Sequence, residues 1–205
     1  IDDVVDVIRE EAEKDYQMVS GITGDVESGD RVWSLTRARL PWLLIGLLGG
    51  ILGARVLGAN ESALAQIQGI AFFIPLIAAM AGNVGVQSSS IVVQTIASGA
   101  RDFDSIGKKL MKELAVGLIT ALVFSTLIFA YNFIFGDSLK LTWAVSISLF
   151  IVIVFASLFG TTIPLVLNKL KIDPALATGP FITTTNDILG LIMYMMVAKT
   201  FFDII

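Results

Sequence analysis

The sequence predicts an all-α, polytopic membrane fold with five transmembrane helices, and three observations lead to this prediction. Hydrophobic residues make up 55% of the 205 positions and charged residues only 16%. In a soluble domain of this size about a quarter of the residues are charged. The mean hydropathy of the chain is +0.82. The apolar residues also fall in long runs, which favour membrane-spanning helices over the short segments of a soluble core.

Five apolar runs are each long enough to cross about 30 Å of hydrocarbon as a helix of about 20 residues. The second run is too long for one simple span, and it contains Pro75 and the segment Gly82-Asn83-Val84-Gly85. We therefore expect a broken or bent helix there, since irregular backbone at membrane depth is tolerated only inside protein or along a cavity. The expected spans are approximately 41–58, 63–98, 113–135, 141–168 and 174–203.

The first thirty residues differ from the rest of the chain, because they contain ten of its eighteen acidic residues. Apolar positions at steps of three or four predict an amphipathic helix over 1–20. The Gly-rich stretch at 21–30 predicts a polar linker. We predict two units, a helix with its linker at 1–30 and a transmembrane pore domain at 31–205. The chain opens inside this helical pattern, so we expect it to be a piece of a longer protein.

The positions of Lys and Arg predict the orientation in the membrane. If the N-terminus is cytoplasmic, nine basic residues lie at the cytoplasmic borders of the spans and three at the external borders. This agrees with the excess of lysine and arginine in the cytoplasmic loops of membrane proteins. The C-terminus is then external after five spans. The inner group is Arg31, Arg37, Arg39, Arg101, Lys108, Lys109, Lys112, Lys169 and Lys171, and the outer group is Arg55, Lys140 and Lys199.

Neither cysteine nor histidine occurs in the sequence, and this limits the chemistry. Disulfides, thiolate or imidazole metal sites and Ser-His or Cys-His catalysis are excluded, so we predict that the chain is not an enzyme. Any metal must be held by oxygen atoms, which hard cations such as Mg²⁺ and Ca²⁺ prefer. No basic patch with interleaved aromatic residues is present, so nucleic acid is not an expected partner.

Asp187 is the most informative residue, because it lies inside the last apolar run. We place it 13 residues beyond Pro174, about 20 Å along the expected helix. A charged group near the centre of a bilayer costs at least about 2.5–3.5 kcal/mol, so it marks a functional site facing water by default. The alternative is an internal ion pair, for which Arg55 and Lys199 are the basic residues within the expected spans.

Thr183 and Gly179 precede Asp187 by four and eight residues, on the same helical face. We expect Gly179 to leave room for a pore, and Pro180 to free the carbonyl of Leu176 for water or an ion. Carboxylate, hydroxyl and carbonyl oxygens would then form a path for a hydrated cation. The alternative is that the threonines only join helices by hydrogen bonds, as small polar residues do in membranes.

Two further residues are candidate metal ligands. Asn83 lies between glycines in the second run and offers a carbonyl oxygen, or it serves helix packing. Asp173 precedes Pro174, and this spacing favours a helix cap followed by proline at the first helical position. Its alternative role is a metal site at the cytoplasmic mouth.

Several motifs, in order along almost the whole chain, resemble the MgtE magnesium channels: DVIREEAEKDYQMVSG, RLPWLLIGLLGG, FFIPLIAAMAGNVGVQSSSIVV and KIDPALATGPFITTTNDILGLIMY. The resemblance implies a homodimer in the bacterial inner membrane, with five membrane helices per subunit and a pore on the two-fold axis. It implies that Asp187 holds hydrated Mg²⁺, that Asn83 lies beside this filter, and that Asp173 belongs to an inner-mouth site. The helix at 1–20 resembles a plug that closes the pore when cytosolic Mg²⁺ is plentiful. The cytosolic sensing and CBS domains that the family carries are absent from this chain.

Two functions follow from these residues. The first is passive conduction of Mg²⁺, because Mg²⁺ dehydrates reluctantly and prefers water with one or two carboxylates. The alternative is a secondary transporter that exchanges Mg²⁺ for Na⁺ or H⁺, using the broken second span for alternating access. Such transporters are often built from inverted repeats, and we detect none among the five spans.

Overall fold

The computed structural model describes residues 7, 13, 16–23, 26–97, 106–136, 138–177 and 179–203. Within these ranges the chain forms helices and turns and contains no strand. The helix expected at 1–20 lies largely outside the described residues, although 16–19 are helical. The predicted division into a unit at 1–30 and a unit at 31–205 therefore stays a prediction.

Five helices of the described chain are long and apolar enough to cross a membrane, which confirms the predicted all-α architecture. Short helical segments, α3 (Glu61–Gln66), η1 (Ile70–Phe73) and η2 (Pro174–Ala177), connect some of them. The long helices are α2 (Val32–Ala59), α4 (Ile74–Ala97), α5 (Ile106–Phe135), α6 (Leu139–Lys169) and α7 (Pro180–Phe202).

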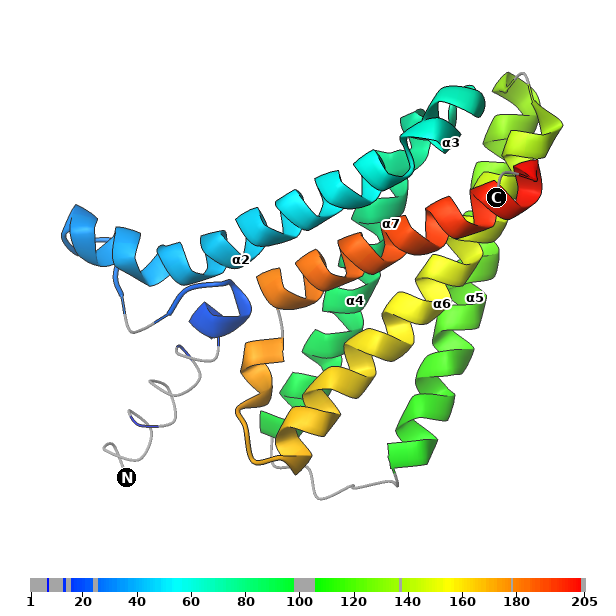
Figure 1. The fold of residues 1–205 in the computed structure, drawn as a ribbon. Coiled ribbons are helices and arrows are strands. Elements are labelled where there is room, and N and C mark those ends of the chain that lie inside the picture. Colours follow the sequence, from blue (N-terminus) through cyan, green and yellow to red (C-terminus); the bar gives the residue numbers. More distant parts are fainter. Residues whose placement is uncertain are drawn as a thin grey trace.

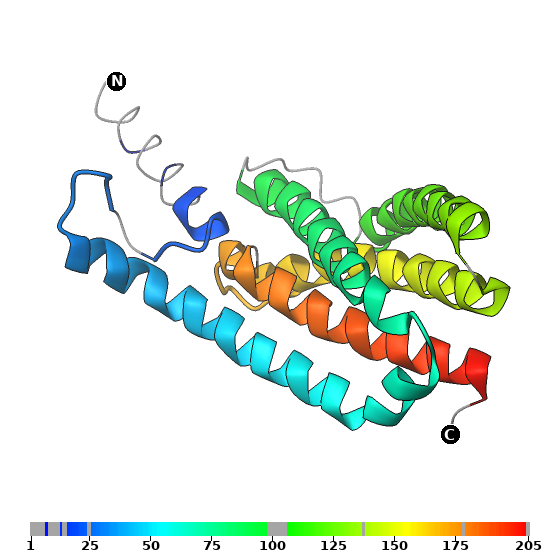
Figure 2. The same ribbon diagram turned by 90° about the horizontal axis from the view of Figure 1, so that it is seen from above.

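The helices alternate in direction along the bundle (Figure 1). Helices α2, α5 and α7 run one way, while α4 and α6 return. Helix α6 packs against α4, α5 and α7 and is the most buried, so the core lies around it. Helices α2 and α7 run side by side, as the view from above also shows (Figure 2).

Small residues bring the helices of this bundle close together. A Cβ atom at Gly160 of α6 would collide with the carbonyl oxygen of Gly85 in α4, and one at Gly117 of α5 would lie 2.8 Å from Ser157 Oγ. Such backbone contact is how membrane helices gain packing energy where lipid is as apolar as the protein. The hydroxyl of Tyr194 in α7 adds a hydrogen bond to the carbonyl of Ile70, at 2.8 Å.

The second apolar run is broken, but not where the sequence predicts. Its break lies at 67–69, where Gly69 has a positive φ of 85°, a conformation that glycine adopts without strain. Pro75 is the second residue of α4, where a missing N–H group disturbs no helical hydrogen bond. The segment from Gly82 to Gly85 lies within continuous helix, so the prediction of an irregular backbone there is wrong.

The last span begins at Pro180 rather than Pro174. Residues Pro174–Ala177 form the separate turn η2, and Gly179, at a positive φ of 53°, precedes α7. The sequence could not distinguish two prolines that each suit the first position of a helix. The third span is also longer than predicted, because α5 begins at Ile106, seven residues before Glu113.

The segment before α2 folds back onto the bundle. The Thr23 N–H donates to the carbonyl of Ala38 at 2.9 Å, and the Trp42 indole donates to the Thr23 hydroxyl at 2.9 Å. A Cβ atom at Gly179 would collide with the carbonyl oxygen of Val19. Residues 16–23 are thereby held against the beginning of α7.

Candidate cation site

Asp187 is the eighth residue of α7, about 10 Å along the helix from Pro180. Its side chain is half-buried and lines a cavity of about 410 Å³ between α2, α4 and α7. Its Oδ1 atom is buried and has no hydrogen-bond partner among the described residues. Buried polar atoms in proteins almost always have partners, so this unpartnered oxygen singles out Asp187 as a candidate ligand.

Gly82 of α4 makes room for the carboxylate. A Cβ atom at this position would lie 2.7 Å from Asp187 Oδ1 and 2.9 Å from Thr183 Cγ2. The carboxylate therefore rests against the bare backbone of α4, which holds the side chain at one place along the cavity.

Helix α2 contributes a glycine-rich wall to the same cavity. Gly46, Gly49, Gly50 and Gly53 all line it, at spacings of three and four residues that place them on one helical face. Gly49 lies against Thr184, because a Cβ atom there would collide with the threonine methyl group. This wall is not among the features predicted above, although the small-residue spacing in LLGGILGA is a known signal for close helix contact.

Two more cavities lie along the groove between α2 and α7. One of about 580 Å³ is lined by Ser20, Arg39, Trp42 and Pro180. One of about 530 Å³ lies towards the other end of the helices and is lined by residues that include Asn60, Lys199 and Asp203. The Asp187 cavity lies between them, so the groove offers space along most of the height of the bundle.

The structure contradicts an internal ion pair for Asp187. Among the described residues, no lysine or arginine lies within ion-pair distance of it. Lys199 is twelve residues further along α7, about 18 Å at 1.5 Å per residue.

Thr183 and Gly179 lie at the start of α7, and their predicted place on the ion path stays a prediction. The Thr183 hydroxyl donates to the carbonyl of Gly179 at 3.1 Å, which also accepts from the Thr183 N–H at 3.0 Å. Gly179 lies before the helix and contacts Val19. Pro180 is the first residue of α7 and Leu176 belongs to η2, so the two do not lie in one helix. The expected role of the Leu176 carbonyl as a ligand of water or an ion stays a prediction.

Asn83 lies on the exposed face of α4. It is one residue beyond Gly82 but does not line the Asp187 cavity. Gln87, one turn further, is also exposed. Polar side chains on the outer face of a membrane helix are costly in lipid, and they face a partner helix or water by preference.

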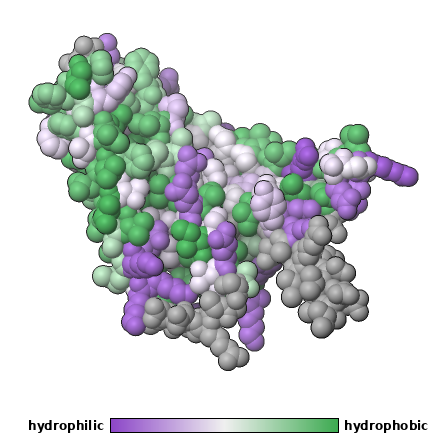
Figure 3. Space-filling view, turned by 180° about the vertical axis from the view of Figure 1, so that it is seen from behind, coloured by the Kyte–Doolittle hydropathy of each residue, from purple (hydrophilic) through white to green (hydrophobic). Residues whose placement is uncertain are grey.

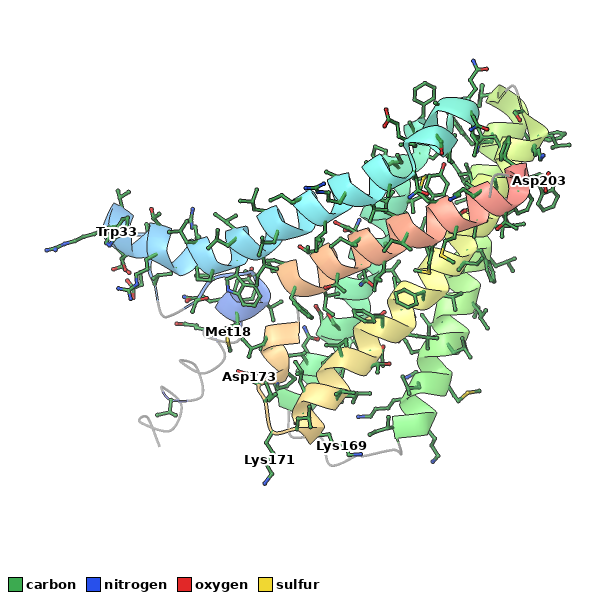
Figure 4. The ribbon with its side chains drawn as sticks, in the orientation of Figure 1. Met18, Trp33, Lys169, Lys171, Asp173 and Asp203 are labelled. Atoms are coloured by element: carbon green, nitrogen blue, oxygen red, sulfur yellow. The ribbon has the colours of Figure 1, made fainter. Side chains whose placement is uncertain are left out.

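Asp173 caps the turn η2, as the spacing predicts. Its Oδ1 atom accepts a hydrogen bond from the Ala175 N–H at 2.8 Å, and its side chain is exposed. Figure 4 shows it in the connection between α6 and α7, at the end of the bundle where α7 begins. A cap leaves the second carboxylate oxygen able to bind a cation, so the inner-mouth role stays a prediction.

Comparison with known proteins identifies the family. A sequence model of the MgtE family, described as a divalent cation transporter, matches residues 74–197. The magnesium transporter MgtE of Bacillus subtilis is 34% identical over 98% of this chain and 45% of its own length. The proteins of the same name from Enterococcus faecalis and Thermus thermophilus are each 33% identical, over 98% and 97% of this chain and 44% of their own lengths.

The chain belongs to the MgtE family. It spans a little under half the length of these curated relatives. MgtE proteins are transporters, which confirms that the chain is not an enzyme. Five membrane-capable helices in a transporter family also place it in a membrane.

Two buried or inward-facing polar residues of this MgtE chain, Asn186 and Glu113, are not among the predicted site residues. Asn186 is fully buried, neither atom of its side-chain amide has a partner among the described residues, and it packs against Gly85. Glu113 lies two turns inside α5, and its Oε1 atom accepts hydrogen bonds from Ser88 and Ser157, both at 2.6 Å. The sequence placed Glu113 at a span end, because the polar first turns of α5 hid where the helix begins.

Proposed function

We propose that this chain forms the membrane pathway of a Mg²⁺-selective channel, in which Asp187 from each of two subunits holds a hydrated ion. The main support is a half-buried carboxylate with an unpartnered oxygen in a cavity inside an apolar bundle. Such a group costs at least about 2.5–3.5 kcal/mol at the bilayer centre, and binding of a cation offsets that cost. The curated relatives named magnesium transporters support Mg²⁺ as the transported ion.

The chemistry of Mg²⁺ suits this arrangement. Mg²⁺ keeps several of its waters and binds through one or two carboxylates. Within the described part of one chain, no three acidic side chains gather as a metal site. Two Asp187 side chains related by a two-fold axis supply two charges, while retained waters keep binding weak enough for the ion to leave.

A homodimer also accounts for the exposed polar face of α4. Asn83 and Gln87 would face a partner or the ion path rather than lipid. Two-fold assemblies are the commonest homo-oligomers. We further propose a cytoplasmic N-terminus and an external C-terminus in the bacterial inner membrane, from the excess of lysine and arginine at one end of the spans.

Regulation by Mg²⁺ belongs to the same proposal. Asp173 would bind a second ion at the inner mouth through its exposed carboxylate. The acidic residues of 1–20 would draw together around divalent ions and act as a plug. Residues 16–23 already lie against the start of α7, which is where such a plug would act.

A growth assay tests the proposed function. The chain carrying Asp187→Ala should fail to rescue a magnesium-starved bacterium, while the unchanged chain rescues it. Glu61→Ala is the matched control, because Glu61 is also acidic but exposed at the start of α3 and lines none of the cavities described above. Equal amounts of each variant in the membrane fraction must be confirmed. Full rescue by Asp187→Ala would exclude this residue from the ion path.

A further inference from the structure

Lys199 is a basic residue in the last turn of α7 that the proposed function does not use. It lies twelve residues beyond Asp187, about 18 Å along the helix, and is half-buried. Lys199 lines the cavity of about 530 Å³ near the carboxyl-terminal end of the groove between α2 and α7. Among the described residues, no carboxylate lies within ion-pair distance of its ammonium group.

The cavity at Lys199 adjoins the carboxylate cavity described above. In α7, Leu191 lines the carboxylate cavity and its neighbour Ile192 lines the lysine cavity. In α2, the neighbours Leu57 and Val56 are divided between the two cavities in the same way. A cation that moves along the groove from the carboxylate towards the end of α7 therefore passes the lysine.

The wall of the lysine cavity carries an unbalanced positive charge. Lys199 and Asp203 are the charged residues that line it. Asp203 is already paired, because the Lys140 Nζ atom lies 3.6 Å from its Oδ2 atom. The Asp203 side chain is also 89% exposed, so water screens its charge.

Few other charged groups surround this end of the bundle. Figure 4 shows Asp203, and with it the end of α7, at the upper end of the bundle. On the face seen in Figure 3, hydrophilic side chains gather at the lower end, where α5 begins, and the upper end is mostly hydrophobic. The half-buried charge of Lys199 therefore dominates the potential in its cavity.

We propose that Lys199 forms an electrostatic barrier in the ion path, beyond Asp187, and sets the rate at which Mg²⁺ passes. This inference rests on the proposed function, because it takes the groove between α2 and α7 as the path. A fixed charge repels a divalent ion twice as strongly as a monovalent ion at the same distance. Conduction requires that an ion can both enter and leave, so the lysine keeps divalent ions from accumulating beyond the carboxylate.

Two common roles of a lysine at a helix end do not account for its place on the cavity wall. A basic residue in the last turn complements the helix dipole, and a long basic side chain reaches the lipid head groups. Neither role requires the ammonium group in a cavity that adjoins the carboxylate. The barrier does, and it predicts that the Mg²⁺ current follows the charge at position 199.

The charge at this position can be varied within one folded protein. The chain contains no cysteine, so Lys199→Cys places a single thiol in each subunit. Trimethylammonioethyl methanethiosulfonate restores a positive charge, sulfonatoethyl methanethiosulfonate adds a negative one, and methyl methanethiosulfonate leaves the site neutral. The Mg²⁺ current of the purified chain in planar bilayers should rise from the positive through the neutral to the negative adduct.

The size of the effect depends on ionic strength. At about 0.01 M the Debye length is about 30 Å, and the positive and neutral adducts should differ by about tenfold in Mg²⁺ current. This is the factor for a divalent ion that passes a unit charge at about 6 Å in water. At about 1 M, reached with the chloride of a bulky organic cation, the Debye length is about 3 Å and the difference should largely vanish.

Arg55→Cys is the matched control for these adducts. Arg55 carries the same charge and lies near the same end of the bundle, one turn before the end of α2. It is exposed and lines neither cavity. The same three adducts at position 55 should change the Mg²⁺ current much less, and Lys199→Arg should keep the current of the unchanged chain.

Three outcomes would overturn the barrier. These are equal currents for all three adducts at position 199, an equal loss with charged adducts of either sign, and a response at position 55 as large as that at position 199. Currents that ignore the charge at position 199 would overturn this inference alone. A chain that passes no Mg²⁺ in any form would overturn the proposed function and the barrier together.

Discussion

At the scale of single residues, the position of the Asp187 carboxylate depends on the absence of a side chain at Gly82. The Gly82→Ala variant would place a methyl group 2.7 Å from Asp187 Oδ1, which is too close for either group to stay in place. The carboxylate must then rotate or α4 must shift. We expect Mg²⁺ uptake into liposomes to fall at least about tenfold, as when a catalytic or binding group is misplaced by about 1 Å.

Gly58→Ala is the matched control for this prediction. Gly58 lies near the end of α2, and a Cβ atom there meets nothing within 4 Å. Alanine is also the better helix former by about 1 kcal/mol. Mg²⁺ uptake by the Gly58→Ala variant should therefore equal that of the unchanged chain. If Gly82→Ala transports as well as Gly58→Ala does, the close contact with α4 has no role in transport.

Asp173 and Asp187 should also differ in how strongly they couple to divalent ions. Asp173 is exposed, so water screens its charge and can replace it as a ligand. Asp187 is half-buried with an unpartnered oxygen. We expect Asp173→Asn to reduce the Mg²⁺-induced rise in melting temperature less than Asp187→Asn does. Equal or reversed losses in a thermal titration would contradict this ranking.

The sequence predicts some of these residues better than others. Asp187 stands out because a single charge in an apolar run is visible without coordinates. The unpartnered amide of Asn186 and the hydrogen bonds of Glu113 are not visible, because they depend on which helices become neighbours. Thr183 shares the helical face of Asp187, as the spacing of four residues predicts, because both side chains lie against Gly82. Gly179 does not share that face, because α7 begins at Pro180 rather than at Pro174.

At the scale of helices, residues 16–23 connect the N-terminal segment to α2 and α7 through Thr23, Trp42 and Gly179. If the helix at 1–20 is a plug, then Ser20 reports its position. The chain contains no cysteine, so Ser20→Cys gives a single spin label per subunit. Millimolar Mg²⁺ should shorten the distance between the two labels, since divalent ions bridge carboxylates that otherwise repel each other.

Sodium chloride of the same ionic strength is the control, because monovalent salt only screens charge within about 8 Å. Neutralising Asp3, Asp6, Glu10 and Glu13 together should remove the response to Mg²⁺. A distance distribution that is the same with and without Mg²⁺ would show that this segment is a passive tether.

The number of helices is easier to predict from the sequence than the residues at which each helix begins and ends. Five apolar runs predict five spans because crossing about 30 Å of hydrocarbon requires a fixed length. The boundaries at Val32 and Ile106 extend beyond the apolar runs into polar residues, where hydropathy gives no signal. The break at Gly69 depends on a backbone conformation that the sequence permits but does not require.

At the scale of the whole molecule, the proposed pore requires two copies of the chain. One Asp187 supplies a single charge, and the described chain brings no further acidic cluster to it. We expect light scattering in mild detergent to give the mass of a dimer. A monomer that still transports Mg²⁺ in liposomes would contradict the two-fold site.

Single-channel recording of the purified chain in planar bilayers tests the central claim most directly. With Mg²⁺ as the only permeant cation, the account predicts discrete unitary currents that disappear in Asp187→Asn and persist in Glu61→Gln, which changes an exposed acid outside the groove. Unitary currents also separate a channel from an exchanger, whose turnover is too slow to resolve. Currents of unchanged size in Asp187→Asn, or Mg²⁺ flux without unitary currents, would contradict the account.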